Sequence, residues 1–294
     1  MANSNLSKYI QLIRPEQWIK NLFVLAPVLF AGKILQHEAL FPSLIAMISF
    51  CLVSSAVYCI NDAADAEADR HHSKKRTRPV ASGAISRINA FLTAILLFAC
   101  SILLSWAFID HSTMFVLASY LVINIGYTFW LKYIAIIDIC IIAIGFLLRL
   151  CAGALASECH LSAWIVVVTF ILSLFLALGK RREDSDLIQP DSKRRLYSSE
   201  FIDMAMVLTG SAVIVSYFIY TITPSQSRII TSELFYLSGI PVLTGILRYI
   251  QICVDANSGA NHHRLLFKDN VILLSIVTYA LMLIIFLYGT NSSI

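Results

Sequence analysis

Long runs of apolar residues, almost free of charge, constrain the fold of this chain more than any other feature. An α-helix needs about 20 residues to cross the hydrocarbon core of a bilayer, and several runs approach that length. Hydrophobic residues make up 58% of the 294 residues and charged residues only 14%, whereas soluble domains carry about 25% charge. This composition excludes an ordinary globular enzyme, a disordered regulator and a fibrous protein. The sequence predicts an all-α polytopic membrane protein with a single transmembrane domain over residues 1–294.

Nine transmembrane spans follow from the lengths of these runs. The predicted spans are Trp18–Ile34, Leu40–Ile60, Ile88–Ile109, Met114–Leu131, Ile134–Ala156, Leu161–Leu178, Met204–Ile222, Leu234–Ile252 and Val271–Tyr288.

Lysine and arginine residues are distributed unevenly between the loops. Nineteen of the 22 lie at the N-terminus or in alternate loops on the same side, and only Lys33 and Arg228 lie in loops on the opposite side. Cytoplasmic loops carry the excess of Lys and Arg, so we expect a cytoplasmic N-terminus and an outer C-terminus in the cytoplasmic (inner) membrane. The two long loops on the cytoplasmic side, residues 61–87 and 179–203, hold most of the ionisable residues and are predicted to form the active site.

The segment NDAADAEADR, residues 61–70, is the most specific motif and follows the second predicted span. Its alanines favour a helix that continues beyond the membrane surface. On such a helix Asp62, Asp65 and Asp69 are spaced i, i+3, i+7 and share one face. Stacked carboxylates repel each other unless a cation lies between them, and Mg²⁺ binds hard oxygen ligands together with substrate phosphates. The motif therefore predicts a Mg²⁺ site formed by the three aspartates.

Neighbouring residues extend this face or leave it. Tyr58 lies on it one turn earlier and Asn61 flanks it, which makes both candidates for substrate binding, whereas Glu67 points elsewhere. A solvated acidic helix end would explain the motif without a ligand, although ordered carboxylates at a membrane boundary need a reason. A Ca²⁺-binding loop fits less well, because the glycine and the final glutamate of an EF-hand are missing. The seven cysteines form no CxxC pair and no Cys/His cluster with metal-ligand spacing.

The pattern NDxxDxxxD at the end of the second of nine helices resembles the UbiA superfamily of intramembrane prenyltransferases. The downstream segment KRTRPVASG, residues 75–83, is similar to the RP-containing loop of that family, which makes Arg76 and Arg78 candidate substrate-binding residues. The resemblance spans nearly the whole chain. It implies nine helices around a central cavity that opens at the cytoplasmic face, and a first motif that binds Mg²⁺-diphosphate.

Two further segments indicate a branch of the family. RPEQWIKN, residues 14–21, resembles the RPxQWxKN signature of the branch that transfers 5-phosphoribose from phosphoribosyl diphosphate to a polyprenyl phosphate such as decaprenyl phosphate. KRREDSD, residues 180–186, is basic where aromatic prenyltransferases of the family usually carry a second aspartate-rich motif. Asp184 and Asp186 keep some acidic character, so a prenyl diphosphate:aromatic acceptor prenyltransferase of quinone biosynthesis is the alternative. A transporter or flippase fits less well, because the charges gather at one face of the membrane.

Basic residues at the predicted cytoplasmic face suit the anionic groups of these substrates. Guanidinium groups bind phosphate oxygens bidentately, and lysine acts as a mobile point charge. Lys180 and Arg181, at the end of the sixth span, are predicted to act on phosphate in catalysis, and Glu183 beside them is expected to orient a cation or to bind a second Mg²⁺. The alternative for such residues is a solvated positive-inside cluster. The candidate substrate-binding residues at the start of the first span are Arg14, Lys20 and Asn21.

Arg149 differs from these residues because it lies deep within the fifth predicted span. A buried arginine in lipid is costly and usually faces a cavity or an anion. Asp138 falls on the same face of that helix, and a structural ion pair with another helix explains Arg149 as well as a role in substrate binding does. Tyr127 and Lys132 end the fourth span at the predicted active face and are weaker candidates for substrate binding.

The expected reaction needs no catalytic Ser, Cys or His. Mg²⁺ on the diphosphate would stabilise the leaving group while the C1–O bond of ribose breaks. An oxygen of the lipid phosphate, already an anion, then attacks the oxocarbenium-like ribose. The expected partners are phosphoribosyl diphosphate, a polyprenyl phosphate lipid and the bilayer. The net charge of +4 is too modest to require a nucleic acid, and a homo-oligomer is compatible with the sequence.

Overall fold

The computed structural model describes residues 2–71, 75–187, 197–223, 233–255 and 269–286, and every element in these ranges is a helix. Seven of the described helices are long and apolar enough to cross a membrane, and they coincide with the second to the eighth predicted spans. The last described helix, α12 (Asn270–Ile284), is apolar but shorter. The all-α, multi-pass membrane architecture is therefore confirmed, whereas the count of nine spans and the cytoplasmic opening of a cavity stay predictions.

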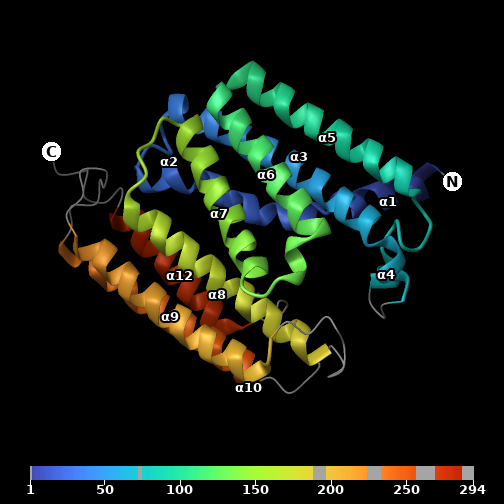
Figure 1. Cartoon of the computed structure of the whole chain (residues 1–294). Helices are drawn as coiled ribbons and strands as arrows, with labels where there is room; N and C mark the ends of the chain where they lie inside the picture. The colour runs from blue at the N-terminus through green and yellow to red at the C-terminus, as the bar shows by residue number, and fades with distance from the viewer. Residues whose placement is uncertain (1, 72–74, 188–196, 224–232, 256–268, 287–294) are drawn as a thin grey trace. The chain divides into compact units, whose positions relative to one another are not determined.

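Figure 1 shows the helices in order along the chain. They belong to two compact units, each of which has its own buried core. The first unit comprises Met1–Leu29, Lys33–Lys132 and Leu148–His160, and the second comprises Phe30–Gly32, Tyr133–Leu147 and Leu161–Ile294. Helix α7 (Ile137–Ala156) contributes its first half to the second unit and its second half to the first.

The first unit is built from long helices joined by short ones. Its elements are α1 (Ala2–Ile13), η1 (Pro15–Leu25), α2 (Ala26–Phe30) at its boundary, α3 (His37–Ala64), α4 (Ala66–Arg70), η2 (Lys75–Thr77), α5 (Arg87–Phe108), α6 (His111–Phe129) and η3 (Leu131–Tyr133), which also lies at a boundary.

Helix α3 forms the centre of the first unit. It packs against α5, α6 and η1, as Figure 1 shows for the two long helices, and 61% of its most apolar stretch is buried. Small buried residues such as Ala46, Ser49 and Ala56 let neighbouring backbones approach. At one such approach Ser101 of α5 donates a hydrogen bond to the carbonyl oxygen of Ser49 at 2.8 Å. The aspartate motif thus begins at the end of the most deeply packed helix of this unit.

The first predicted span, Trp18–Ile34, is not one continuous α-helix. The chain instead forms the 3₁₀ helix η1, followed by the five-residue helix α2. The carbonyl oxygen of Val24 lies so near α7 that a Cβ atom on Gly153 would sit 1.8 Å from it. Trp18 donates from η1 to the Ser55 hydroxyl of α3 at 3.0 Å. These contacts to α3 and α7 favour the 3₁₀ conformation of η1, which the apolar run by itself does not predict.

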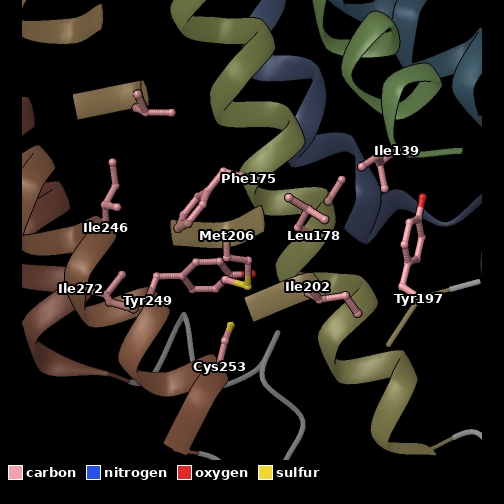
Figure 2. Packing of buried hydrophobic residues seen from close by; sticks show 12 residues of the cluster. Ile139, Phe175, Leu178, Tyr197, Ile202, Met206, Ile246, Tyr249, Cys253 and Ile272 are labelled. Atoms are coloured by element: carbon pink, nitrogen blue, oxygen red, sulfur yellow. The ribbon is translucent and has the colours of Figure 1, made fainter. Parts of the chain in front are cut away.

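The second unit consists of the first half of α7 with α8 (Ala163–Leu187), α9 (Ser199–Ile222), η4 (Glu233–Ser238), α10 (Gly239–Asp255) and α12. Figure 2 shows its core, in which Phe175 and Met206 lie beside Tyr249. A Cβ atom on Gly179 would lie 2.1 Å from the hydroxyl oxygen of Tyr249, so α8 and α10 approach closely where the basic KRREDSD segment begins. Asp269 caps α12 through the backbone N–H groups of residues 271 and 272.

Candidate functional site

The aspartate motif lies where α3 passes into α4. Helix α3 ends at Ala64, Asp65 leaves helical geometry with φ −87° and ψ 0°, and α4 begins at the next residue. Backbone hydrogen bonds still run from the Asp65 N–H to the Asn61 carbonyl at 2.9 Å and from the Asp69 N–H to the Asp65 carbonyl at 2.8 Å. The predicted helical continuation is therefore present, with one interruption at Asp65.

Asp62 and Asp69 are buried and share one arginine. Their exposed fractions are 1% and 3%. The Nη1 atom of Arg78 donates to Asp69 Oδ2 at 2.7 Å and to Asp62 Oδ1 at 3.3 Å. Arg14 donates from Nη2 to the same Asp62 oxygen at 2.5 Å, and its guanidinium lies 5.2 Å from the ring centroid of Tyr58. The cluster thus joins three sequence segments, which contribute the two aspartates, Arg14 and Arg78, and Tyr58 lies beside it.

Asp65 has a different partner. Lys132 contacts Asp65 Oδ1 through Nζ at 2.6 Å, and the Asp65 carboxylate is partly exposed. One turn earlier Thr128 donates a hydrogen bond to the Asn61 amide oxygen. Glu67 is exposed and pairs with Arg87 at 3.3 Å, so it leaves the shared face as the helical spacing predicts. Thr128 was missed because it lies within an apolar run and belongs to no motif.

The chemistry of this cluster suits a divalent cation. Asp62 Oδ2 is buried and has no hydrogen-bond partner among the residues that the structure describes, and an unsatisfied carboxylate oxygen is costly unless a ligand binds it. Within the described ranges no three His, Cys, Asp or Glu side chains converge as a complete metal site. Mg²⁺, however, is usually bound by one or two carboxylates together with substrate phosphates and waters. Asp62 and Asp69 are the residues that fit this role best.

A second polar cluster surrounds Arg149 in the first unit. Arg149 is 5% exposed, and its Nε donates to Asn21 Oδ1 at 2.8 Å while Nη2 donates to the Tyr120 hydroxyl at 3.1 Å. Its guanidinium also lies about 5 Å from the ring centroids of Phe50 and Tyr120. Asn21 in turn donates to the Ser54 hydroxyl at 3.2 Å. Arg149 thus engages neutral hydrogen-bond partners and aromatic rings, and its role in substrate binding stays a prediction.

In the second unit the predicted phosphate-binding Arg181 makes a buried ion pair. Its Nε donates to Asp138 Oδ2 at 2.9 Å, and Asp138 is fully buried. Tyr197 donates its hydroxyl to the other oxygen of Asp138 and accepts the backbone N–H of Ile136. Burial and the hydrogen bond to Asp138 raise the pKa of Tyr197, which keeps this hydroxyl a donor. Tyr197 belongs to no sequence motif, so this contact could not be predicted.

Other residues of the KRREDSD segment lie close by. Arg182 pairs with Asp203 at 2.8 Å, which joins α8 to α9. Lys180 is exposed and Glu183 is half-buried. The side chains of Asp184 and Asp186 lie outside the described part of the chain. Among the remaining predicted residues of the first unit, Lys20 and Tyr127 are half-buried and Arg76 is exposed on η2.

Fold and site together define a class: multi-pass helical membrane proteins with an aspartate-rich motif at the end of a span. Residues 24–271 match the UbiA prenyltransferase family, and the chain belongs to this family of membrane-embedded transferases. The resemblance drawn from the sequence motifs is confirmed.

Two relatives illustrate the branch. The chain is 32% identical to decaprenyl-phosphate phosphoribosyltransferase of Mycolicibacterium smegmatis, over 91% of this chain and 88% of that protein. It is 34% identical to the enzyme of the same name from Corynebacterium glutamicum, over 90% of this chain and 81% of that protein. The fold is similar to a UbiA homologue from Archaeoglobus fulgidus bound to DMAPP and Mg²⁺, with a TM-score of 0.71, 17% identity, and coverage of 98% of this chain and 100% of that one.

Proposed function

We propose that this protein transfers 5-phosphoribose from phosphoribosyl diphosphate to a decaprenyl-type polyprenyl phosphate and releases diphosphate, in a reaction that depends on Mg²⁺. The observation that carries the proposal is the similarity, over about nine tenths of the chain, to proteins named decaprenyl-phosphate phosphoribosyltransferase. The basic KRREDSD segment supports it, because a donor with a separate 5-phosphate and a phosphate-bearing acceptor require more positive charge than a prenyl diphosphate does.

The aspartate cluster is proposed to bind the diphosphate end of the donor. Asp62 and Asp69 would hold Mg²⁺ with Asp65 beside them, and the bound ion would stabilise the negative charge that develops on the diphosphate as it leaves. The A. fulgidus homologue bound to DMAPP and Mg²⁺ supports the use of a divalent cation. Arg14 and Arg78 already lie within hydrogen-bond distance of the carboxylates, so their guanidinium groups are placed to contact phosphate oxygens.

Other residues are proposed to orient the substrates rather than to move protons. The acceptor phosphate is already an anion, so positioning and electrostatics supply the catalysis. In the second unit Lys180 and Arg181 are proposed to bind phosphate oxygens, with Arg181 held in place by Asp138. The remaining proposed substrate-binding residues are Lys20, Asn21, Tyr58, Asn61, Arg76, Tyr127, Lys132, Arg149 and Glu183.

The contacts rank these residues. Lys132 contacts Asp65 directly, and Tyr58 contacts Arg14 beside Asp62, which supports a role for both at the donor. Asn21 accepts from Arg149, which also donates to Tyr120 inside the apolar core. These contacts support a role in holding η1 against α3 and α7 at least as well as a contact with substrate.

The proposed location is the cytoplasmic membrane, with nine spans, the N-terminus in the cytoplasm and the C-terminus outside. The uneven distribution of Lys and Arg supports this orientation. Cysteine accessibility tests it: single cysteines in residues 75–80 should react only from the cytoplasm, and cysteines in residues 291–294 only from outside. A cytoplasmic C-terminus would contradict the nine-span arrangement.

A direct test offers the purified protein, in lipid nanodiscs, two substrate pairs in separate reactions. The first pair is labelled phosphoribosyl diphosphate with decaprenyl phosphate, and the second is a labelled prenyl diphosphate with 4-hydroxybenzoate. We expect a lipid product only from the first pair, and mild acid should release ribose 5-phosphate from it. Prenylated 4-hydroxybenzoate, with no product from the first pair, would overturn the proposed donor while leaving the family assignment intact.

A further inference from the structure

The aspartate cluster of the first unit is electrically balanced by its own basic residues. Within the described residues each aspartate of the motif accepts from at least one cationic side chain, and none lies farther than 3.3 Å from its partner. The three carboxylates are those of Asp62, Asp65 and Asp69, and the three cations are those of Arg14, Arg78 and Lys132. A free divalent ion therefore meets a neutral cluster rather than a strongly acidic one.

Arg78 holds a special position in this balance. Among the described residues it alone bridges the two buried carboxylates, and its own side chain is 27% exposed. The turn that carries it is built into the core, since Val80, Ala81 and Ile85 are buried. The Ile85 N–H also bonds the Pro79 carbonyl at 3.0 Å. A folded turn thus delivers the guanidinium to the place where a cation between Asp62 and Asp69 has to lie.

A free metal ion gains little by entering this cluster. It would have to displace the guanidinium from two buried carboxylates and leave that charge without a partner, while Mg²⁺ itself gives up water reluctantly. A diphosphate changes the balance, because its oxygens offer the displaced arginines new anionic partners in bidentate geometry. The Asp62 Oδ2 atom is buried and accepts no hydrogen bond from the described part of the chain, so a cation can bind it without first displacing an arginine.

We propose that Arg78, assisted by Arg14, is the resident counter-ion of the aspartate cluster, so that the cluster accepts a divalent cation as a complex with a diphosphate and discriminates against the free ion. This inference rests on the proposed function only in assigning the metal to Asp62 and Asp69. It makes Arg78 a positioning residue, whose guanidinium moves from carboxylate to phosphate when the donor binds.

Equilibrium dialysis with Mn²⁺ as the probe tests the inference without any transfer reaction. The wild-type protein in nanodiscs is dialysed against Mn²⁺ alone or against Mn²⁺ with inorganic diphosphate on both sides, and the excess Mn²⁺ on the protein side is measured. We expect diphosphate to tighten Mn²⁺ binding at least about tenfold, within the range typical of coupled sites. In Arg78→Gln, Mn²⁺ alone should bind at least about fivefold tighter than in the wild type, and the effect of diphosphate should shrink.

Matched variants make the outcome decisive. Arg87→Gln removes a positive charge from a nearby surface pair with Glu67 and should bind Mn²⁺ as the wild type does. Arg14→Gln leaves Asp62 with Arg78 as its one remaining partner and should shift free Mn²⁺ affinity in the same direction as Arg78→Gln, which provides a second measurement if the Arg78 variant does not fold. Unchanged or weaker binding of free Mn²⁺ in both arginine variants would overturn the inference.

A further variant separates this inference from the proposed function. Asp62→Asn should abolish Mn²⁺ binding with and without diphosphate. If Asp62→Asn still binds Mn²⁺ as the wild type does, the metal assignment of the proposed function fails. If Asp62→Asn loses binding while the arginine variants resemble the wild type, the metal site stands and the counter-ion role of Arg78 is wrong.

Discussion

Two buried carboxylate clusters in this molecule look alike in composition but differ in how completely their oxygens are bonded. In the second unit both oxygens of Asp138 are occupied, one by Arg181 and the other by Tyr197. In the first unit one oxygen of Asp62 accepts from both Arg14 and Arg78, and the other has no partner among the described residues. A fully bonded buried carboxylate stabilises a fold, whereas a partly bonded one is costly without a ligand. The comparison supports a structural role for Asp138 and the proposed ligand-binding role of Asp62.

The largest expected effect is on stability in the second unit. Asp138→Asn removes a fully buried carboxylate that accepts from both Arg181 and Tyr197, and breaking a buried ion pair from one side costs up to about 3–5 kcal/mol of unfolding free energy. We expect a marked fall in the thermal midpoint of the detergent-solubilised protein, measured by tryptophan fluorescence. The double variant Asp138→Asn/Arg181→Gln should recover part of the loss. A melting curve like that of the wild type would contradict the structural role of Asp138.

The matching substitution in the first unit should affect turnover instead. Asp62→Asn removes the carboxylate that is proposed to hold Mg²⁺, and we expect kcat to fall at least ~10²-fold, about 2.7 kcal/mol in activation free energy. Asp69→Asn should be comparably damaging, and EDTA should abolish turnover of the wild type. Glu67→Gln is the matched control on the same segment, because this exposed side chain leaves the shared face. Full activity in EDTA would refute the metal site.

Two neighbouring residues near the end of α8, Lys180 and Arg181, allow a second comparison between a ligand-binding and a structural role. Lys180 is exposed, so Lys180→Ala should raise KM for a phosphate-bearing substrate by roughly tenfold, since a charged hydrogen bond contributes about 1.5–3 kcal/mol. Arg181→Ala should lower both stability and activity, because it also removes the partner of Asp138. Steady-state kinetics beside thermal melting separates the two, and an Arg181→Ala variant as stable as the wild type would contradict the structural role.

The smallest expected effect concerns a carboxylate at the surface of the second unit. Hydrogen bonds from Arg248 and from the backbone N–H of Ile272 hold the pKa of Asp269 below its usual value. Because the folded pKa is depressed, the stabilisation is complete above the unfolded pKa near 3.8 and is lost as the pH falls through the lower folded value. The difference in thermal midpoint between wild type and Asp269→Asn should therefore narrow on acidification below about pH 4. A constant difference across that range would contradict the assignment.

Much of the fold follows from the apolar runs, because seven of them are long enough to span a bilayer and form helices near the predicted limits. The helical spacing of the aspartates also anticipated that Asp62 and Asp69 face the same way and that Glu67 does not. The broken winding of η1 was beyond such reasoning, since it depends on the approach of Val24 to Gly153 on a distant helix.

The sequence also does not show which charged residues contact one another. The position of Arg181 in a basic segment favours phosphate binding. Only the folded chain shows that Arg181 donates to Asp138, whose other oxygen accepts from Tyr197. Arg149 likewise stands out in the sequence as a charge deep in an apolar run, and only the folded chain shows that it donates to Asn21 and Tyr120. Charge in a sequence shows where electrostatics matter, but tertiary contacts decide which charges stay available for a ligand.

The backbone of Arg14 points to a trade-off between function and stability. This residue adopts φ +53° and ψ +63° immediately before Pro15, a left-handed conformation that costs a non-glycine residue about 1–2 kcal/mol. Glycine would relieve that strain but would remove the guanidinium from Asp62. Selection for stability alone would favour Gly or Asn at this position. An arginine retained on unfavourable backbone marks the start of η1 as a place where engineering for thermostability is expected to sacrifice activity.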